Sequence, residues 1–138
     1  MKMSDLIMAR SDGAVMVAND KRERAAWASL NPIPRDRAWL QLYLLRDWGF
    51  EPRLAEGRRT AAEQAAKVAA GTSKTMHSDH VTGNAWDICD LHHGWNAPNR
   101  FWQAVGRSAR IVGAVWGGQW KTFPDVAHNS WRGGVIVG

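Results

Sequence analysis

The sequence predicts an α+β domain in which a small antiparallel sheet packs with about three helices. Its 138 residues are enough for one hydrophobic core but few for two. The composition, 45% hydrophobic and 22% charged, is typical of a folded protein. Helical and strand patterns follow one another without sustained βαβ alternation, which favours an antiparallel sheet over a parallel one.

The first half of the chain predicts a helix and a strand after a poorly patterned arm. Residues 1–33 contain two apolar runs, LIMA and AVMVA, around SDG, and we expect a hairpin or loose arm followed by a short helix. DRAWLQLYLLRDWGF predicts a helix with Asp36 as N-cap and Gly49 at its end. EPRLAEGRR then predicts a strand that runs towards Thr60.

The middle of the chain predicts a capped helix, a loop and a strand. Thr60 and Glu63 have the spacing of a capping box at the start of an alanine-rich helix. GTSKTMHSDHVTG has the composition of a loop. AWDICDL alternates as a strand does, so Asp87 should lie on one face and Trp86 and Ile88 on the other.

The last forty residues predict one more helix and two short strands. Apolar residues repeat at helical spacing between residues 99 and 113, beginning at Phe101. Glycine pairs then interrupt the chain, and we expect strands around AVW and GVIVG.

Charge and cysteine content limit the possible functions. A net charge of +5 and a pI near 10.0 predict attraction to a polyanion, which could be nucleic acid, anionic lipid or an acidic cell wall. The single cysteine, Cys89, excludes an internal disulfide and a multi-cysteine zinc knuckle. No apolar run approaches the length of a signal peptide or a membrane span, so we expect a protein kept in the cytoplasm until it is released.

One stretch, SDHVTGNAWDICD, carries a candidate metal site. It places His80 and Asp87 seven positions apart around a glycine. A catalytic zinc commonly has three protein ligands and one open position, so a third ligand must come from elsewhere. His128 is a candidate because Asp125, three residues earlier, could act as a general base beside the metal. By spacing alone, a polar turn is the commoner explanation of such a stretch, because a lone histidine near a strand is usually a satisfied polar residue.

The remaining histidines and the C-terminal tryptophans have simpler interpretations. His77, His92 and His93 lie in segments typical of solvated loops. We expect three tryptophans near the C-terminus to lie in the core or in the wall of a pocket rather than to form a surface on which a ligand stacks: Trp116, Trp120 and Trp131.

The motifs resemble those of a known family, the zinc D-Ala-D-Ala metallopeptidases. This family includes vancomycin-resistance dipeptidases and carboxypeptidases and phage L-alanyl-D-glutamate endolysins. Its S-x-H-x-x-G-x-A-x-D signature is matched by Ser78, His80, Gly83, Ala85 and Asp87. Four further motifs resemble the family or its endolysin branch: GRRT at 57–60, GTSKT at 71–75, WGGQW at 116–120 and DVAH at 125–128. The resemblance covers about residues 36–131.

The resemblance implies a role for each matching residue. His80, Asp87 and His128 would hold one Zn²⁺ ion, Asp125 would be the catalytic base, and Arg59 would steady the carbonyl oxygen of the bond being cut. Four residues would bind substrate or support the site: Ser73, Ser78, Gln64 and Trp120. Members of the family often follow the second histidine with an apolar residue and then Glu or Gln, whereas this chain has Asn129 and Ser130.

The resemblance also implies a function. We expect a zinc peptidase that hydrolyses the stem peptides of bacterial peptidoglycan, at the L-Ala-D-Glu bond, as a phage-type endolysin. Residues 1–138 would form a single catalytic domain without a separate wall-binding domain. We expect a monomer that binds no nucleic acid, inserts into no membrane and reaches the wall through a lesion in the host membrane.

Three alternatives remain. A D-alanyl-D-alanine carboxypeptidase or dipeptidase would use the same metal chemistry. A metal-dependent nuclease could use His92 and His93 with Asn96 or Asn99 and His128, but leaves the ten-residue signature without a role. A wall-binding module could keep zinc and lose catalysis, although it would need neither Asp125 nor Arg59.

Overall fold

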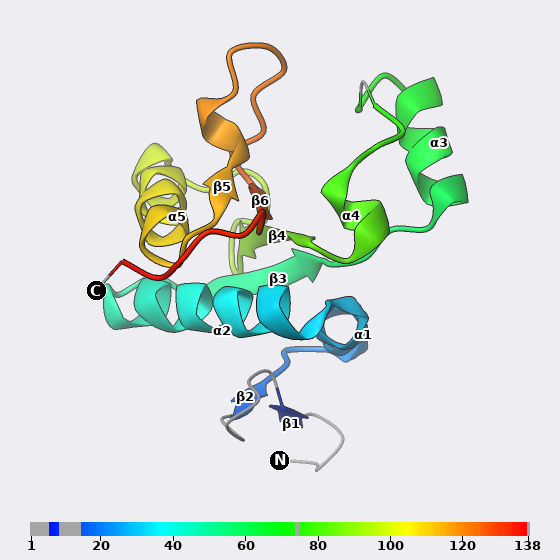
Figure 1. The fold of residues 1–138 in the computed structure, drawn as a ribbon. Helices are drawn as coiled ribbons and strands as arrows, with labels where there is room; N and C mark the ends of the chain where they lie inside the picture. Colours follow the sequence, from blue (N-terminus) through cyan, green and yellow to red (C-terminus); the bar gives the residue numbers. More distant parts are fainter. Residues whose placement is uncertain (1–5, 9–14, 74, 138) are drawn as a thin grey trace.

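The computed structural model describes residues 6–8, 15–73 and 75–137, and it confirms the predicted α+β class. Within these residues, a four-stranded antiparallel sheet has the order β3-β4-β6-β5 (Figure 1). Its strands, in that order, are Pro52–Glu56, Ala85–Asp90, His128–Ser130 and Val115–Trp116. The described residues form five helices, α1 to α5: Lys21–Ser29, Pro32–Asp47, Ala61–Ala69, Asp79–Thr82 and Asn99–Ile111.

Part of the N-terminal arm forms the expected hairpin. β1 (Leu6–Met8) pairs antiparallel with β2 (Val15–Val17) as a separate two-stranded sheet. The short helix expected after it is α1. Residues 1–5 and 9–14 of the arm lie outside the described residues.

The start of α2 differs from the prediction. Asn31 rather than Asp36 is the N-cap, and Pro32 and Pro34 fall within the first turn. Proline is well suited to the first helical position because its fixed φ matches the helix and its missing N–H would have no helical partner there. The helix ends as predicted, with Gly49 at φ +92° just beyond it.

Two further predictions differ in outcome. The capping box of α3 is confirmed, since the Thr60 side chain accepts from the Glu63 N–H and the Glu63 side chain accepts from the Thr60 N–H.

The prediction of a strand at GVIVG is wrong, because residues 133–137 have no strand structure. Val135 is 74% exposed, so the apolar run has no buried face to occupy. The sheet instead takes its fourth strand from β6.

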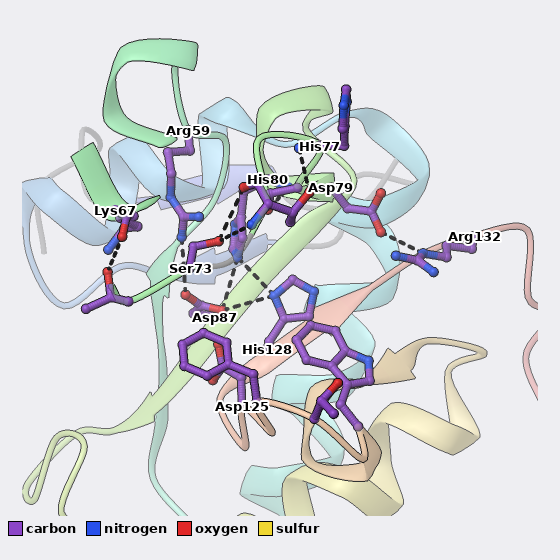
Figure 2. Close-up of a pocket in the computed structure, with 16 residues that line it drawn as sticks. Arg59, Lys67, Ser73, His77, Asp79, His80, Asp87, Asp125, His128 and Arg132 are labelled. Carbon is purple, nitrogen blue, oxygen red and sulfur yellow. Dashed lines mark hydrogen bonds and ion pairs between the residues drawn. The ribbon is translucent and has the colours of Figure 1, made fainter. Parts of the chain in front are cut away.

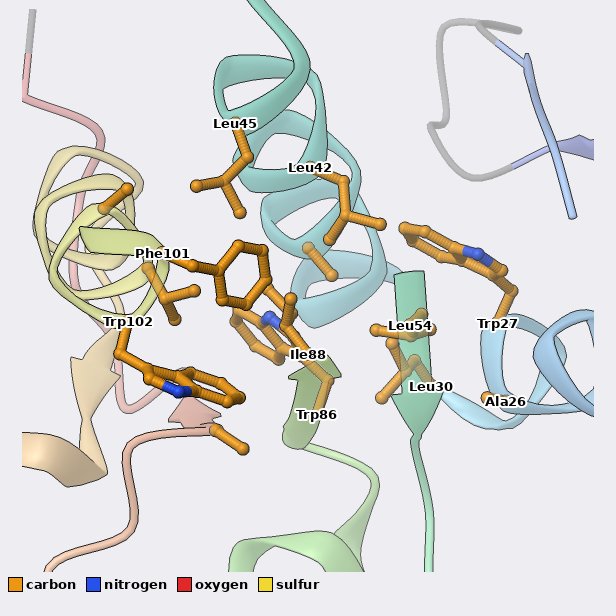
Figure 3. Close-up of a cluster of buried hydrophobic side chains, with 14 of the residues drawn as sticks. Ala26, Trp27, Leu30, Leu42, Leu45, Leu54, Trp86, Ile88, Phe101 and Trp102 are labelled. Carbon is orange, nitrogen blue, oxygen red and sulfur yellow. The ribbon is translucent and has the colours of Figure 1, made fainter. Parts of the chain in front are cut away.

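The core lies where α2 and α5 meet the sheet (Figure 3). Trp86 and Ile88 point from β4 into this core, on the face opposite Asp87, as alternation predicts. They pack with large side chains from the neighbouring elements: Trp27, Leu42, Leu45, Leu54 and Phe101. None of the helices formed by the described residues is long and apolar enough to cross a bilayer.

A buried carboxylate joins α1 to the sheet. Glu23 is fully buried, and its side chain accepts hydrogen bonds from the Leu54 N–H at 2.9 Å and from Trp27 Nε1 at 3.4 Å. It also accepts from the backbone and side chain of Asn19 at 2.9 and 2.7 Å. These donors replace the water that the carboxylate loses on burial.

Removing this carboxylate should destabilise the fold. Glu23→Ala leaves several donors without a partner, and we expect the free energy of unfolding to fall by about 2–4 kcal/mol. Urea titration followed by tryptophan fluorescence measures the change. Glu51→Ala removes an exposed carboxylate that pairs with the equally exposed His92, and it should change stability by less than about 1 kcal/mol. An equal effect of both substitutions would contradict the role given to Glu23.

Candidate metal centre

The structure brings together the three residues predicted as metal ligands. His80 Nε2 lies 3.2 Å from Asp87 Oδ1 and 3.1 Å from His128 Nδ1, and all three side chains are buried (Figure 2). Their candidate ligand atoms lie within 4.8 Å of one another, which would allow one ion to contact all three. Asp87 and His128 are cross-strand partners in the β4–β6 pair, so their side chains share a face.

His80 lies in a short helix, α4, that places its side chain in the cluster. The loop predicted for residues 71–83 contains α4, which the Ser78 side chain caps by accepting from the His80 N–H. Gly83 ends the helix at φ +80°, in the left-handed region that favours glycine. The serine and glycine of the signature therefore shape the turn that carries the histidine.

The second nitrogen of His80 is held by the backbone. His80 Nδ1 lies 2.8 Å from the carbonyl oxygen of Gly57, an acceptor, so Nδ1 carries the hydrogen. In the neutral ring Nε2 then presents its lone pair to Asp87 and His128. A metal-binding histidine is usually oriented in this way, by a hydrogen bond from its other ring nitrogen.

Burial and charge set the protonation of the cluster. Burial raises the pKa of Asp87, but the imidazoles of His80 and His128 outweigh it and hold that pKa at about 2. Burial lowers the pKa of His128 to about 4. Burial also lowers the pKa of His80, yet the closer carboxylate of Asp87 reverses the effect and the net shift is upward. A carboxylate and two imidazoles are a donor set that suits zinc, and binding would displace a proton from His80.

Asp125 faces the same pocket from the loop before β6. Its Oδ1 accepts from the Ala127 N–H at 3.2 Å, and its backbone N–H donates to the Gly117 carbonyl at 2.9 Å. The pKa of Asp125 is raised, mainly because burial removes water from its carboxylate and also because the negative charge of Asp87 is near. Gly117 permits this approach, because a Cβ there would lie 2.5 Å from the Asp125 carbonyl oxygen and 3.0 Å from the His128 Cβ.

Arg59 approaches the cluster from the segment after β3. It is 6% exposed, and its Nη2 lies 4.0 Å from Asp87 Oδ2. Its Nε donates to Glu56 Oε1 at 2.9 Å and its Nη1 donates to Gln64 Oε1 at 2.5 Å.

The four supporting residues have different positions. Gln64 is fully buried, so it acts through its neighbours rather than as a contact surface. Ser73 and Ser78 line the pocket, and Ser78 also caps α4. Trp120 lines the pocket with its ring centroid 4.8 Å from that of His128.

The residue after His128 anchors its strand. Asn129 is fully buried and accepts from Gln41 Nε2 at 2.9 Å, while its own amide donates to the carbonyls of Ala127 and Trp86. Gln41 in turn accepts from Trp86 Nε1 at 2.8 Å. Asn129, which departs from the family's pattern, therefore has hydrogen-bond partners in the core for its side chain.

The pocket has a volume of about 310 Å³ and includes residues that the sequence did not single out. Lys67 and Phe123 line it, and Arg132 Nε donates to Asp79 Oδ2 at 2.7 Å at the edge shown in Figure 2. Phe123 has φ +57°, an uncommon conformation for a bulky residue. His77, interpreted from sequence as a solvated loop residue, also lines the pocket.

Two of the histidines of the nuclease alternative, His92 and His93, form ion pairs away from the cluster. His92 pairs with Glu51, and His93 pairs with Asp90 at 2.7 Å. Among the described residues, the one group placed to hold a metal is the cluster of His80, Asp87 and His128.

Comparison with known proteins agrees with the motifs. A family model described as D-alanyl-D-alanine carboxypeptidase matches residues 71–131. The L-alanyl-D-glutamate peptidase of Listeria phage A118 is 34% identical over 93 residues, which cover 61% of this chain and 33% of that protein. The chain therefore spans about one third of the length of this relative. The resemblance to the D-Ala-D-Ala metallopeptidase family is confirmed.

Two solved structures have a fold similar to that of this chain. The L-Ala D-Glu endopeptidase ChiX of Serratia marcescens is 28% identical, with a TM-score of 0.66 and coverage of 84% of this chain and 90% of that chain. The D,D-pentapeptidase VanY of a VanB-type resistance cassette, solved in complex with Zn(II), is 18% identical. Its TM-score is 0.57, with coverage of 95% of this chain and 81% of that chain.

A methyl group at Gly117 should disturb the centre. Gly117→Ala places a methyl group against both the Asp125 carbonyl oxygen and the His128 Cβ, so these segments must shift, and we expect a stability loss of about 1–3 kcal/mol. We also expect zinc affinity, measured by calorimetry, to fall about 10- to 100-fold, as when other supports of a metal ligand are removed. Gly94→Ala is the control, because a Cβ there meets nothing within 4 Å and only the φ of +57° is strained. Unchanged zinc affinity in Gly117→Ala would contradict this account.

Proposed function

We propose that this chain is a zinc-dependent peptidase that cuts peptidoglycan stem peptides between L-Ala and D-Glu. The observation that carries the proposal is the convergence of His80, Asp87 and His128 in a pocket that Asp125 and Arg59 also line. The phage peptidase and the Serratia endopeptidase are both named for this bond. In this proposal the two histidines and Asp87 hold one Zn²⁺ ion.

The surrounding residues suit peptide hydrolysis. Bound zinc would supply Lewis acidity, which polarises the peptide carbonyl and acidifies water. Asp125 takes a proton from the attacking water as the water oxygen bonds to the carbonyl carbon. It returns that proton to the nitrogen as the C–N bond breaks. The raised pKa of Asp125 favours this exchange, because a carboxyl group of higher pKa is a stronger base.

Arg59 complements this proton transfer. Its Nη2 faces Asp87 and the pocket, where it can bond the carbonyl oxygen as that oxygen gains negative charge. A donor fixed in place before reaction stabilises the transition state more than the substrate. The buried Arg59 also leaves the cluster near Asp87 less negative, which favours an approaching electron-rich carbonyl.

The setting of the enzyme is part of the proposal. The basic composition suits an anionic bacterial wall, and the relation to a phage peptidase suits an endolysin that reaches the wall through a membrane lesion. A D-alanyl-D-alanine carboxypeptidase is the second candidate, favoured by the description of the family model that matches residues 71–131.

Zinc binding should depend on the three ligands. Protein stripped with a chelator should bind one Zn²⁺ ion in calorimetry, and we expect His80→Ala or His128→Ala to lower the affinity at least about 100-fold. His93→Ala, which removes an exposed histidine, is the matched control and should bind as the unsubstituted protein does. Equal affinity in all three variants would exclude the proposed ligands.

Digestion of peptidoglycan should identify the bond. We expect zinc-loaded protein to release fragments with new amino termini on D-Glu, identified by mass spectrometry. Asp125→Ala should lower kcat at least about 100-fold, because it removes the proton acceptor. Asp47→Ala, at the exposed end of α2, is the control. Free D-Ala as the product would favour the carboxypeptidase, and full activity in Asp125→Ala or after chelation would overturn the mechanism.

A further inference from the structure

An irregularity in the sheet places an additional carboxylate beside the candidate centre. Leu54 pairs with Ile88 and Glu56 pairs with Asp87, so Ala55 is an extra residue between two consecutive pairs. Such a bulge changes the face on which the following side chain lies, because side chains alternate along a strand. The bulge in β3 thus puts Glu56 on the same side as Asp87.

The Glu56 carboxylate opposite the Asp87 carboxylate would be unfavourable without a cation between them. Two carboxylates directly opposite each other on neighbouring strands repel. Arg59 lies between the two carboxylates: its Nε donates a hydrogen bond to Glu56 Oε1 at 2.9 Å, and its Nη2 forms a longer ion pair, at 4.0 Å, with Asp87 Oδ2. The Glu56 side chain is 27% exposed and that of Arg59 only 7%, so the ion pair is shielded from most solvent.

A buried amide holds the other edge of the guanidinium. Gln64 Oε1 accepts from Arg59 Nη1, while Gln64 Nε2 donates to Ser73 Oγ at 2.9 Å and to the Thr75 carbonyl at 2.6 Å. Because both acceptors of the amide nitrogen lie in the loop after α3, the carbonyl end of Gln64 must face Arg59. Arg59 is therefore fixed at Nε and at Nη1, and Nη2 is the end that faces Asp87.

We propose that Glu56 is a positioning residue for Arg59. Glu56 is not among the residues that line the pocket, and it lies outside the candidate ligand group of His80, Asp87 and His128. Its carboxylate sets the rotation of the guanidinium, with Gln64 as second support, so that Nη2 is directed at the reacting carbonyl. The inference rests on the proposed function for the role of Arg59, but the contact itself can be tested separately.

The first test measures the position of Arg59 without any reaction. In ¹H–¹⁵N spectra of zinc-loaded protein, Arg59 Nε–H should give a signal protected from exchange with water, assigned by its loss in Arg59→Ala. Glu56→Ala should remove or broaden this signal, and Glu56→Gln, which keeps an acceptor oxygen, should retain it. Glu51→Ala, at the other end of the same segment, should leave it unchanged.

The second test asks whether Glu56 acts through Arg59. On a synthetic stem peptide, we expect Glu56→Ala to lower kcat about 10- to 100-fold with little change in KM, and Glu56→Gln to keep most of the activity. Zinc affinity should not change. In an Arg59→Ala background, Glu56→Ala should have no further effect, since the group that it positions is absent.

The outcomes separate this inference from the proposed function. A persistent Arg59 Nε–H signal in Glu56→Ala, or an equal loss of kcat with and without Arg59, would overturn the positioning role. Weaker zinc binding in Glu56→Ala would also overturn it, because Glu56 would then act through its cross-strand partner Asp87 rather than through Arg59. If the unsubstituted protein cuts no stem peptide, the proposed function fails, while the spectra still decide whether Glu56 holds Arg59.

Discussion

The pairing of β4 with β6 is the constraint on which the rest of the candidate site depends. It sets Asp87 opposite His128, so that a ladder of backbone hydrogen bonds determines the distance between two candidate ligands. β6 has only three residues, and its position is reinforced from outside the sheet. The Asn129 side chain bonds to Gln41 of α2 and to the Trp86 carbonyl, which ties the strand to the core.

The same arrangement buries ionisable groups that a cation would suit. A carboxylate and two imidazoles are buried within hydrogen-bonding distance of one another, and burial opposes the charged form of each. Arg59 compensates part of the negative charge but lies 4.0 Å from Asp87. A bound metal ion would contribute the missing attraction, so metal binding and stability should be coupled. The core on the opposite face of β4 supports this buried polar cluster.

The sequence predicts those parts of the structure that depend on residues a few positions apart in the chain. The capping box of Thr60 and the turn between His80 and Asp87 are encoded within a few positions, and the structure brings the predicted ligands together. The strand expected at GVIVG fails, because apolar composition does not reveal that no face is available to bury it. The bulge that redirects Glu56 depends on the register with β4, which a single strand's pattern does not contain.

The residues proposed for catalysis and those proposed to contact substrate lie in different parts of the structure. The candidate ligands and Arg59 are buried and held by the sheet, α4 and Gln64. Other residues that line the pocket, such as Phe123 and Arg132, lie outside the helices and strands. Two solved structures of this fold are named for different bonds, L-Ala-D-Glu and D,D. For the proposed activity, we expect substrate choice to depend on these loop residues, because loops are more variable than the elements that they connect.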